Sequence, residues 1–416
     1  MNKHSKILIT VTLLISVVFT SCKKNSDGPT PSDKYLVSYK KVKTISNLEV
    51  DAALNYLSVL YPNAKTIANK AVSGVTVYKI TYNTTFQSQP IIASGLVCVP
   101  TGLQKYPMIS YQNGTITLHS DAPTVAADTS EMGKLYTFLE TVSSTGFVIA
   151  IPDYIGFGST ENTFHPYLDK ASTIPCVVDM IRAAKELMNS HNLNVQLSND
   201  LYITGYSMGG WATLQLQKAI ETDYSGEFNL KASACGAGPY DLTYINNYVL
   251  GQTQYPMPYF LGYMLNSYTQ LGEITNNLSD IINEPYASKI PGLYDGNYSG
   301  DQINSQLTTS VDSLFTSAYR NGYQSAAEFS SVRQTLSDNS IGAWNISTPL
   351  LLLHGEADTF VPVQVSENLY NDFLNLGVSS NMVHLVTFPG INHTEGIIPS
   401  EIDAINWFIQ IKDGGK

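Results

Sequence analysis

The stretch Ile203–Ala212, ITGYSMGGWA, decides the fold of this chain. Its centre, Gly205-Tyr206-Ser207-Met208-Gly209, fits the pattern G-x-S-x-G. The pattern follows the strand-like run LYIT and opens a helix-like run, which is the strand, turn and helix setting of a nucleophile elbow. Glycines two residues either side of Ser207 leave room for a tight turn in which the serine holds a strained backbone conformation. The alternative interpretation is a serine that only caps the following helix.

Outward from this stretch, continuous apolar runs alternate with helical patterns. Strands are predicted over residues 75–85, 91–100, 108–111, 146–154, 200–207, 230–239, 349–358 and 382–390, and helices over 48–60, 179–191, 208–221 and 401–412. Apolar strands that alternate with helices indicate an α/β fold, with a mostly parallel central sheet covered by helices on both faces.

One long segment interrupts this alternation. Residues 240–345 are rich in Tyr, Asn, Ser and Gly, contain helical patches such as 312–323, and have no apolar run typical of a buried strand. We therefore predict a helical cap or lid at 240–345, inserted into a core formed by residues 35–239 and 346–416. Insertions of this kind often cover active sites.

The N-terminus reads as an export signal. In residues 1–22, Lys3 and Lys6 precede an apolar run that is too short to span a bilayer comfortably. Thr20-Ser21-Cys22 resembles the end of a bacterial lipoprotein signal, in which the cysteine is lipidated. Residues 23–34 are then a flexible tether. The protein is expected in the cell envelope, anchored at Cys22, or, if the signal is an ordinary cleaved one, secreted.

Composition excludes several classes of protein. The formal net charge is −11 and 14% of residues are charged, so neither nucleic acid nor anionic lipid is an expected partner. Membrane contact is expected only through the lipid anchor. Besides Cys22, the chain has Cys98, Cys176 and Cys235, whose spacing fits no metal site; they are expected to be small core residues or to form at most one disulfide.

A serine nucleophile needs a base, and the chain has seven histidines. His393 lies in FPGINHTEG, between the last predicted strand and the last helix, on a loop at the carboxyl end of a strand. Ligands of open α/β sheets bind at that edge. His393 is therefore preferred over the remaining histidines, which are His4, His119, His165, His191, His354 and His384.

The base in turn needs a carboxylate that orients it. LLLLHGEADTFVP offers Glu356 and Asp358 just after a buried strand, and we prefer Asp358 because it lies further along the loop. The alternative for either residue is a solvated loop carboxylate or a helix cap. The order along the chain, Ser207, Asp358 and His393, is that of the α/β-hydrolases.

With these motifs, the chain resembles an α/β-hydrolase and is most similar to the secretory lipase family, in its lipase A-like branch. YPMISYQNGT, IPDYIGFGST, HPYLDKASTIPCVVDMIRAA, GYSMGG, HGEADTFVP and INHTEG carry the resemblance, in that order. It implies a catalytic triad of Ser207, Asp358 and His393 and a helical cap before the strand of the acid. Where many relatives have His-Gly-Thr, this chain has Asn113-Gly114-Thr115.

The expected activity is hydrolysis of a carboxylic ester, as a lipase or esterase, through an acyl-enzyme. The backbone N–H groups of Met208 and of Thr115, in preference to Gly114, are predicted to form the oxyanion hole. No metal or cofactor is needed, and the substrate is a small-molecule, lipid or glycan ester. Two alternatives stay open: a serine peptidase of the same fold, and a catalytically silent surface lipoprotein that only binds its ligand.

Overall fold

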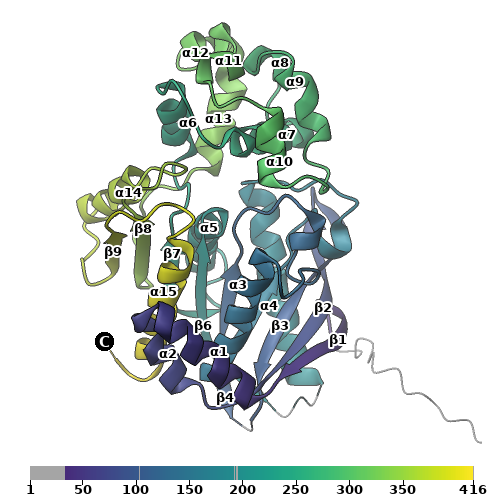
Figure 1. The fold of residues 1–416 in the computed structure, drawn as a ribbon, viewed down its shortest axis with the longest axis vertical. Coiled ribbons are helices and arrows are strands. Elements are labelled where there is room, and N and C mark those ends of the chain that lie inside the picture. Colours follow the sequence, from purple (N-terminus) through teal and green to yellow (C-terminus); the bar gives the residue numbers. More distant parts are fainter. Residues whose placement is uncertain (1–32, 103, 192, 194, 416) are drawn as a thin grey trace, which may run out of the picture.

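The structure is a computed structural model, and it describes residues 33–415 except 103, 192 and 194. Its centre is a sheet of nine strands in the order β1-β2-β3-β5-β4-β6-β7-β8-β9 (Figure 1). The strands are β1 (Leu36–Ile45), β2 (Val75–Phe86), β3 (Gln89–Pro100), β4 (Lys105–Gln112), β5 (Val148–Pro152), β6 (Gln196–Tyr206), β7 (Asn229–Gly236), β8 (Leu350–Gly355) and β9 (Val383–Phe388).

Most of the sheet is parallel. The pairs from β5 through β4, β6, β7 and β8 to β9 all run in parallel, whereas β1, β2, β3 and β5 pair antiparallel at the other edge. All side chains of β5 and β8 are buried, as expected for strands covered on both faces. The α/β fold with a mostly parallel sheet, predicted from the sequence, is confirmed.

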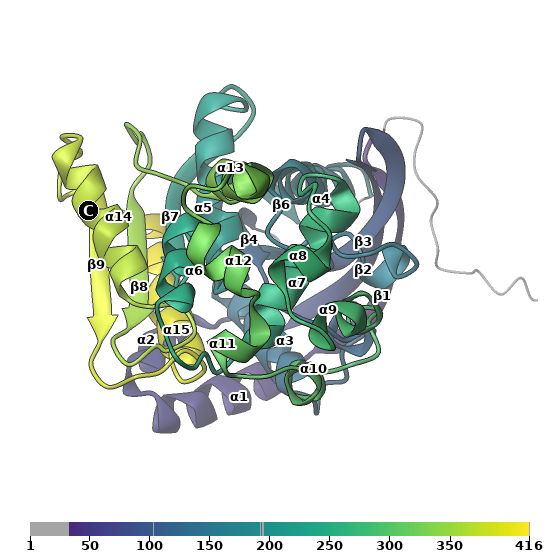
Figure 2. The ribbon, with the colours of Figure 1, turned by 90° about the horizontal axis from the view of Figure 1, so that it is seen from above.

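Helices cover both faces of the sheet (Figure 2). One face carries α1 (Asn47–Leu60), α2 (Lys65–Lys70), α3 (Glu131–Val142) and α15 (Ile397–Lys412). The other face carries α4 (Lys170–Ser190), α5 (Met208–Thr222) and α14 (Gln364–Asn375). Each face has its own cluster of buried apolar side chains, so the sheet separates two cores.

The chain between β7 and β8, residues 237–349, is helical; we call it the inserted segment. It contains α6 (Leu242–Leu250), α7 (Pro258–Leu271), α8 (Leu278–Ile281), α9 (Tyr286–Lys289), α10 (Gly300–Gln306), α11 (Val311–Leu314), α12 (Ser317–Gly322) and α13 (Ser330–Asn339). In Figure 1 these helices form a separate layer above the sheet, at the end where Ser207 follows β6. The inserted segment is therefore placed to face whatever binds at that end.

Strand β1 and helix α3 are among the core elements that were not expected from the sequence. The antiparallel edge strand β1 carries a run of lysines and is largely exposed, so its apolar alternation is weak. Helix α3 begins after a serine cap at Ser130 and packs against the sheet through Leu135 and Leu139. Both elements derive their stability from tertiary contacts that local patterning does not reveal.

Two further observations bear on the sequence expectations. Cys98, Cys176 and Cys235 are buried and unpaired, which favours core residues over a disulfide. Among the described helices, none is both long and apolar enough to cross a bilayer. The signal of residues 1–22 with Cys22, and nearly all of the tether, lie outside the described residues.

Candidate active site

Ser207 occupies a strained turn between β6 and α5. Its backbone φ is 59° and ψ is −124°, a positive-φ combination that residues other than glycine rarely adopt. The flanking glycines are required by close approach: a Cβ on Gly205 would lie 2.3 Å from the carbonyl oxygen of Gln112, and a Cβ on Gly209 would lie 1.9 Å from the same oxygen. The elbow geometry expected from G-x-S-x-G is therefore present, and the serine does not act as a side-chain cap of α5.

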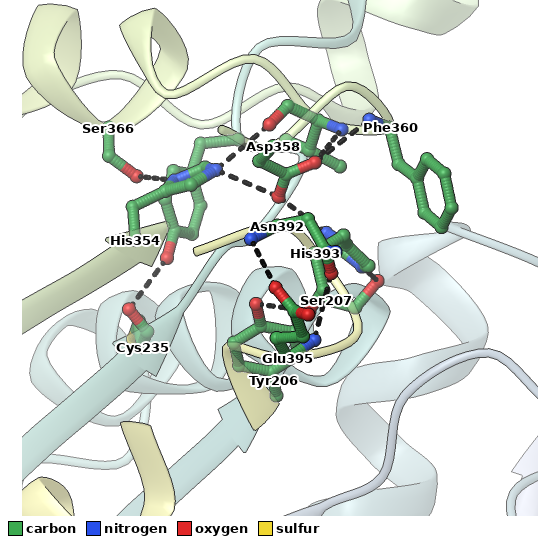
Figure 3. A network of polar contacts seen from close by, with 12 residues as sticks. Tyr206, Ser207, Cys235, His354, Asp358, Phe360, Ser366, Asn392, His393 and Glu395 are labelled. Atoms are coloured by element: carbon green, nitrogen blue, oxygen red, sulfur yellow. Dashed lines mark hydrogen bonds and ion pairs between the residues drawn. The ribbon is translucent and has the colours of Figure 1, made fainter. Parts of the chain in front are cut away.

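The three residues proposed from the sequence meet at one point (Figure 3). His393 Nε2 lies 2.9 Å from Ser207 Oγ, and His393 Nδ1 lies 2.6 Å from Asp358 Oδ2. Asp358 follows β8 and His393 follows β9, so neighbouring parallel strands deliver both side chains to the same edge of the sheet. The chain of contacts runs from a carboxylate through an imidazole to a hydroxyl.

Besides Ser207 and Asp358, further residues contact His393 and restrict its imidazole. The hydroxyl of Tyr206 donates a 2.7 Å hydrogen bond to the backbone oxygen of His393, and the Tyr206 and Phe360 rings each lie 5.2 Å from the imidazole, centroid to centroid. Only 6% of His393 is exposed. The ring therefore has little freedom to rotate away from Ser207.

Asp358 is buried yet fully hydrogen-bonded. Its Oδ1 accepts the backbone N–H groups of Phe360 at 2.8 Å and Val361 at 2.9 Å, while Oδ2 faces two imidazoles, of His393 and of His354. Burial alone would raise the pKa of the Asp358 carboxyl, but hydrogen bonds from His354 and His393 outweigh burial and hold its pKa well below the usual range. The group is thus a carboxylate at any ordinary pH.

The alternative carboxylate lies elsewhere. Glu356 Oε1 accepts a 2.8 Å hydrogen bond from the hydroxyl of Thr387, and the Glu356 side chain is exposed. Of the two acids after β8, the structure brings Asp358 and not Glu356 to His393.

The remaining described histidines are placed away from Ser207. His354 touches the acid from the side opposite His393, with its ring inside the core. The others have separate partners: His119 packs on Phe157, His165 Nδ1 contacts the Ile155 carbonyl, His191 contacts Asp33, and His384 packs on Trp407. Burial lowers the pKa of His165 to about 4, so that ring is neutral. His4 lies outside the described residues.

The loop predicted to complete an oxyanion hole lies against Ser207. A Cβ on Gly114 would stand 3.7 Å from Ser207 Cβ, and the Thr115 hydroxyl contacts the Tyr167 hydroxyl at 2.8 Å. Met208 is the first residue of α5, where helix N–H groups have no partner within the helix. The assignment of the N–H groups of Met208 and Thr115 as donors stays a prediction. The fully buried Asn113 side chain has no hydrogen-bond partner among the residues that the structure describes.

Two pockets meet at Ser207. The first has a cavity volume of about 40 Å³ and is lined mainly by apolar side chains of the inserted segment, among them Ile245, Leu261 and Met264. The second has a cavity volume of about 190 Å³ and is lined by Met132 and Leu135 of α3, by His393, and by the loop at Gly114. Phe260 and Phe360 line both pockets, with ring centroids 6.1 Å apart. The serine hydroxyl therefore stands where two largely apolar spaces join.

A parallel sheet with a strained serine between strand and helix, and an acid and a histidine after later strands, defines an α/β-hydrolase. The secretory lipase family model matches residues 121–415, and the chain belongs to that family. A carboxylic ester hydrolase is thus the class of enzyme to which this protein belongs.

Solved structures share this fold. A putative hydrolase from Legionella pneumophila is 26% identical, with 92% of this chain and 100% of that chain covered and a TM-score of 0.80. The rice cell wall degrading esterase LipA from Xanthomonas oryzae is 23% identical over 92% and 98% of the two chains, with a TM-score of 0.73. Candida antarctica lipase A in its closed state is 16% identical over 91% and 82%, with a TM-score of 0.64. The last two show the likeness of fold alone. Comparison with curated protein sequences gave no match.

Proposed function

We propose that the protein is an exported serine esterase or lipase in which Ser207 is the nucleophile, His393 the general base and Asp358 the orienting acid. The observation that carries the proposal is the unbroken contact chain from Asp358 Oδ2 through His393 to Ser207 Oγ, with separations of 2.6 and 2.9 Å. Both distances allow direct proton transfer or orientation without an intervening water.

The proposed reaction has two halves. Ser207 Oγ attacks the ester carbonyl while His393 Nε2 takes the hydroxyl proton, and the N–H groups of Met208 and Thr115 stabilise the oxyanion. His393 then returns the proton to the departing alcohol, leaving an acyl-enzyme. Water attacks the acyl group in the second half and gives a proton to His393, which passes it to Ser207 Oγ as the bond between Oγ and the acyl group breaks and the acid is released. Asp358 stays ionised throughout and holds the Nδ1 proton of His393.

The two pockets support an ester that is apolar on both sides of its carbonyl. A charged group would lose its hydration in spaces lined by Ile245, Leu261 and Met264 on one side and by Met132 and Leu135 on the other. We propose that residues 240–345 act as a cap that supplies the walls of the first pocket. In this scheme the core, residues 35–239 and 346–416, supplies the reacting groups.

Export and anchoring form the remaining part of the proposal. The family of secretory lipases supports export, and the sequence of residues 1–22 supports a signal that ends at Cys22. We expect the mature protein to carry a lipid on Cys22, and Cys22→Ser to abolish it. Intact-mass measurement of the two purified proteins is the test, and a wild-type mass equal to that of the unmodified chain, with no added lipid, would contradict lipidation.

Labelling with a fluorophosphonate probe tests the reaction most directly. We expect the wild-type protein to label and to hydrolyse a series of nitrophenyl esters, and Ser207→Ala to lose labelling and to lower kcat by at least about 10⁴-fold. Ser225→Ala, an exposed loop serine, is the matched control and should behave as wild type. Persistent labelling of Ser207→Ala, or cleavage of peptide amides in preference to esters, would overturn the proposal.

A further inference from the structure

His354 makes a second contact to the acid that the reaction scheme does not use. It belongs to β8, its side chain is fully buried, and its Nε2 lies 2.9 Å from the carbonyl oxygen of Val361 and 3.2 Å from Asp358 Oδ2. Its Nδ1 lies 2.7 Å from the hydroxyl of Ser366, a buried residue of α14 (Figure 3). Every ring nitrogen of His354 thus has a partner inside the protein.

The partners determine which nitrogen of His354 carries the proton. A backbone carbonyl and a carboxylate can only accept hydrogen bonds, so Nε2 is the protonated nitrogen and donates to both Val361 and Asp358. In the neutral ring, Nδ1 then has a lone pair and accepts the hydroxyl hydrogen of Ser366. Ser366 therefore favours the tautomer that points an N–H group at the acid.

This arrangement fills the acceptor sites of the Asp358 carboxylate. Two backbone N–H groups occupy Oδ1, and two imidazole N–H groups share Oδ2, from His393 at 2.6 Å and His354 at 3.2 Å. Turning the carboxylate would break contacts on both oxygens. The shared oxygen also carries less negative charge toward His393 than it would with a single donor.

We propose that His354 is a positioning residue for ester hydrolysis, which, with Ser366 fixing its tautomer, keeps Asp358 Oδ2 on His393 and limits how tightly His393 holds a proton. The inference rests on the proposed roles of Ser207, His393 and Asp358. His354 does not reach Ser207 or the two pockets and acts only through the acid.

Other ionisable groups around His354, Asp358 and His393 belong to β6, to the inserted segment, to α15 and to the loop of His393. Tyr206 of β6 and Tyr255 of the inserted segment have pKa values raised by burial and, to a lesser extent, by Asp358, so both are neutral. Glu401 of α15 is buried nearby, and burial raises its pKa to about 8. Glu395, on the loop of His393, bonds to that loop's own backbone at Asn392. Because the pKa of Glu401 lies at about 8, its titration would affect the alkaline side of the profile of kcat/KM against pH. The acidic side of that profile is therefore the appropriate readout for His393.

The two decisive variants of His354 differ in whether residue 354 can still donate a hydrogen bond to Asp358 Oδ2. His354→Leu removes it, and His354→Gln replaces it because a glutamine Nε2 reaches about as far as a histidine Nε2. We expect His354→Leu to lower kcat about 10- to 100-fold with KM changed less than about threefold, since a misplaced acid misaligns the base without altering the pockets. We expect His354→Gln to recover most of the lost kcat, and Ser366→Ala to lower kcat by a few-fold.

The pH profile separates positioning from general damage. Loss of one donor leaves more charge on Oδ2, so His393 should hold its proton more tightly and the acidic midpoint of kcat/KM should move to higher pH in His354→Leu, by about half a unit or more. A merely loosened site would weaken the Asp358 contact and move that midpoint down. The matched control is His384→Leu, an exposed histidine of β9, which should leave both kcat and the midpoint unchanged.

Several results would overturn the inference. These are an unchanged kcat in His354→Leu, a midpoint that stays or moves to lower pH, or a failure of His354→Gln to exceed His354→Leu. If His354→Leu does not fold, the same readings on His354→Gln and Ser366→Ala decide, and wild-type values in Ser366→Ala would count against it. If the wild-type protein itself fails to label with fluorophosphonate, the proposed function is at fault and not the role of His354.

Discussion

The loops at the strand ends and the inserted segment contribute to the site in different ways. The loops hold Ser207, Asp358 and His393 by short directional contacts, several of them to backbone atoms. The inserted segment faces the same point mostly with apolar side chains, and one hydrogen bond, from the Tyr255 hydroxyl to the Phe360 carbonyl at 3.0 Å, joins it to the loop of the acid. Bond chemistry depends on fixed geometry, whereas binding of an apolar group depends mainly on shape and area. We therefore expect substitutions in the loops to change rate and those in the inserted segment to change selectivity.

The largest effect is expected at the acid. Asp358→Asn keeps the volume of the side chain but removes the charge that stabilises protonated His393, so kcat should fall about 10³- to 10⁴-fold with little change in KM. Steady-state kinetics on one nitrophenyl ester would measure this. Glu356→Gln, two residues earlier, is the matched control and should keep wild-type kinetics; equal losses in both variants would break the assignment of the acid.

A side chain at Gly209 should destabilise the turn at Ser207 for a steric reason. Gly209→Ala would place a Cβ 1.9 Å from the Gln112 carbonyl oxygen, and β4 would have to move away from α5. We expect the free energy of unfolding to drop by about 4 kcal/mol or more, or no folded protein to be obtained. Thermal unfolding followed by circular dichroism is the measurement. Gly226→Ala, where a Cβ meets no atom within 4 Å, should unfold like wild type.

A smaller effect is expected in the pockets. Met264→Trp fills part of the pocket formed by the inserted segment, and Leu135→Trp fills part of the pocket at α3. If the first pocket binds the acyl group, Met264→Trp should lower kcat/KM for long acyl chains about 10- to 100-fold and spare acetyl esters. Leu135→Trp should instead alter the preference for the alcohol. An identical acyl-length profile in the two variants would show that the pockets do not divide the substrate in this way.

The smallest expected effect concerns stability and pH. Burial raises the pKa of Glu401 from 4.5 to about 8, so between these values the folded protein binds a proton that the unfolded chain has released. Stability from this group is therefore present at low pH and is lost as the pH rises toward and past 8. Glu401→Gln should raise the melting temperature at pH 9 by roughly 2–4 °C and have little effect at pH 5. Asp403→Asn, a half-buried carboxyl on the same helix, should give a smaller difference; a Glu401→Gln protein less stable at pH 9 would contradict this account.

Much of the site was readable from the sequence because local geometry demands particular residues. A strained turn against a neighbouring strand requires glycines at Gly205 and Gly209, so the elbow leaves a pattern in the chain. His393 could be chosen because it follows the last strand, and the structure places it 2.9 Å from Ser207 Oγ. The structure brings Asp358 and not Glu356 into contact with His393, although two residues on one loop differ little in sequence alone.

His354 shows where sequence reasoning stopped. It lies in the same HGEAD stretch as Asp358, and the sequence alone presents it only as one of several candidate bases. Its distance from Asp358, its burial and its contact with Ser366 of α14 depend on how β8 packs against α14. A polar residue at the end of a buried strand next to a candidate acid is the signal that could have suggested a supporting role.

By itself, the sequence determined the α/β fold class, the elbow at Ser207 and the order of Ser207, Asp358 and His393, because each depends on backbone requirements within a few residues. Only the tertiary structure decided that β1 forms the edge of the sheet, that Phe260 and Phe360 both line the two pockets, and that His354 contacts Asp358. These features join residues far apart in the chain, and they exist only once side-chain packing has brought those residues into contact.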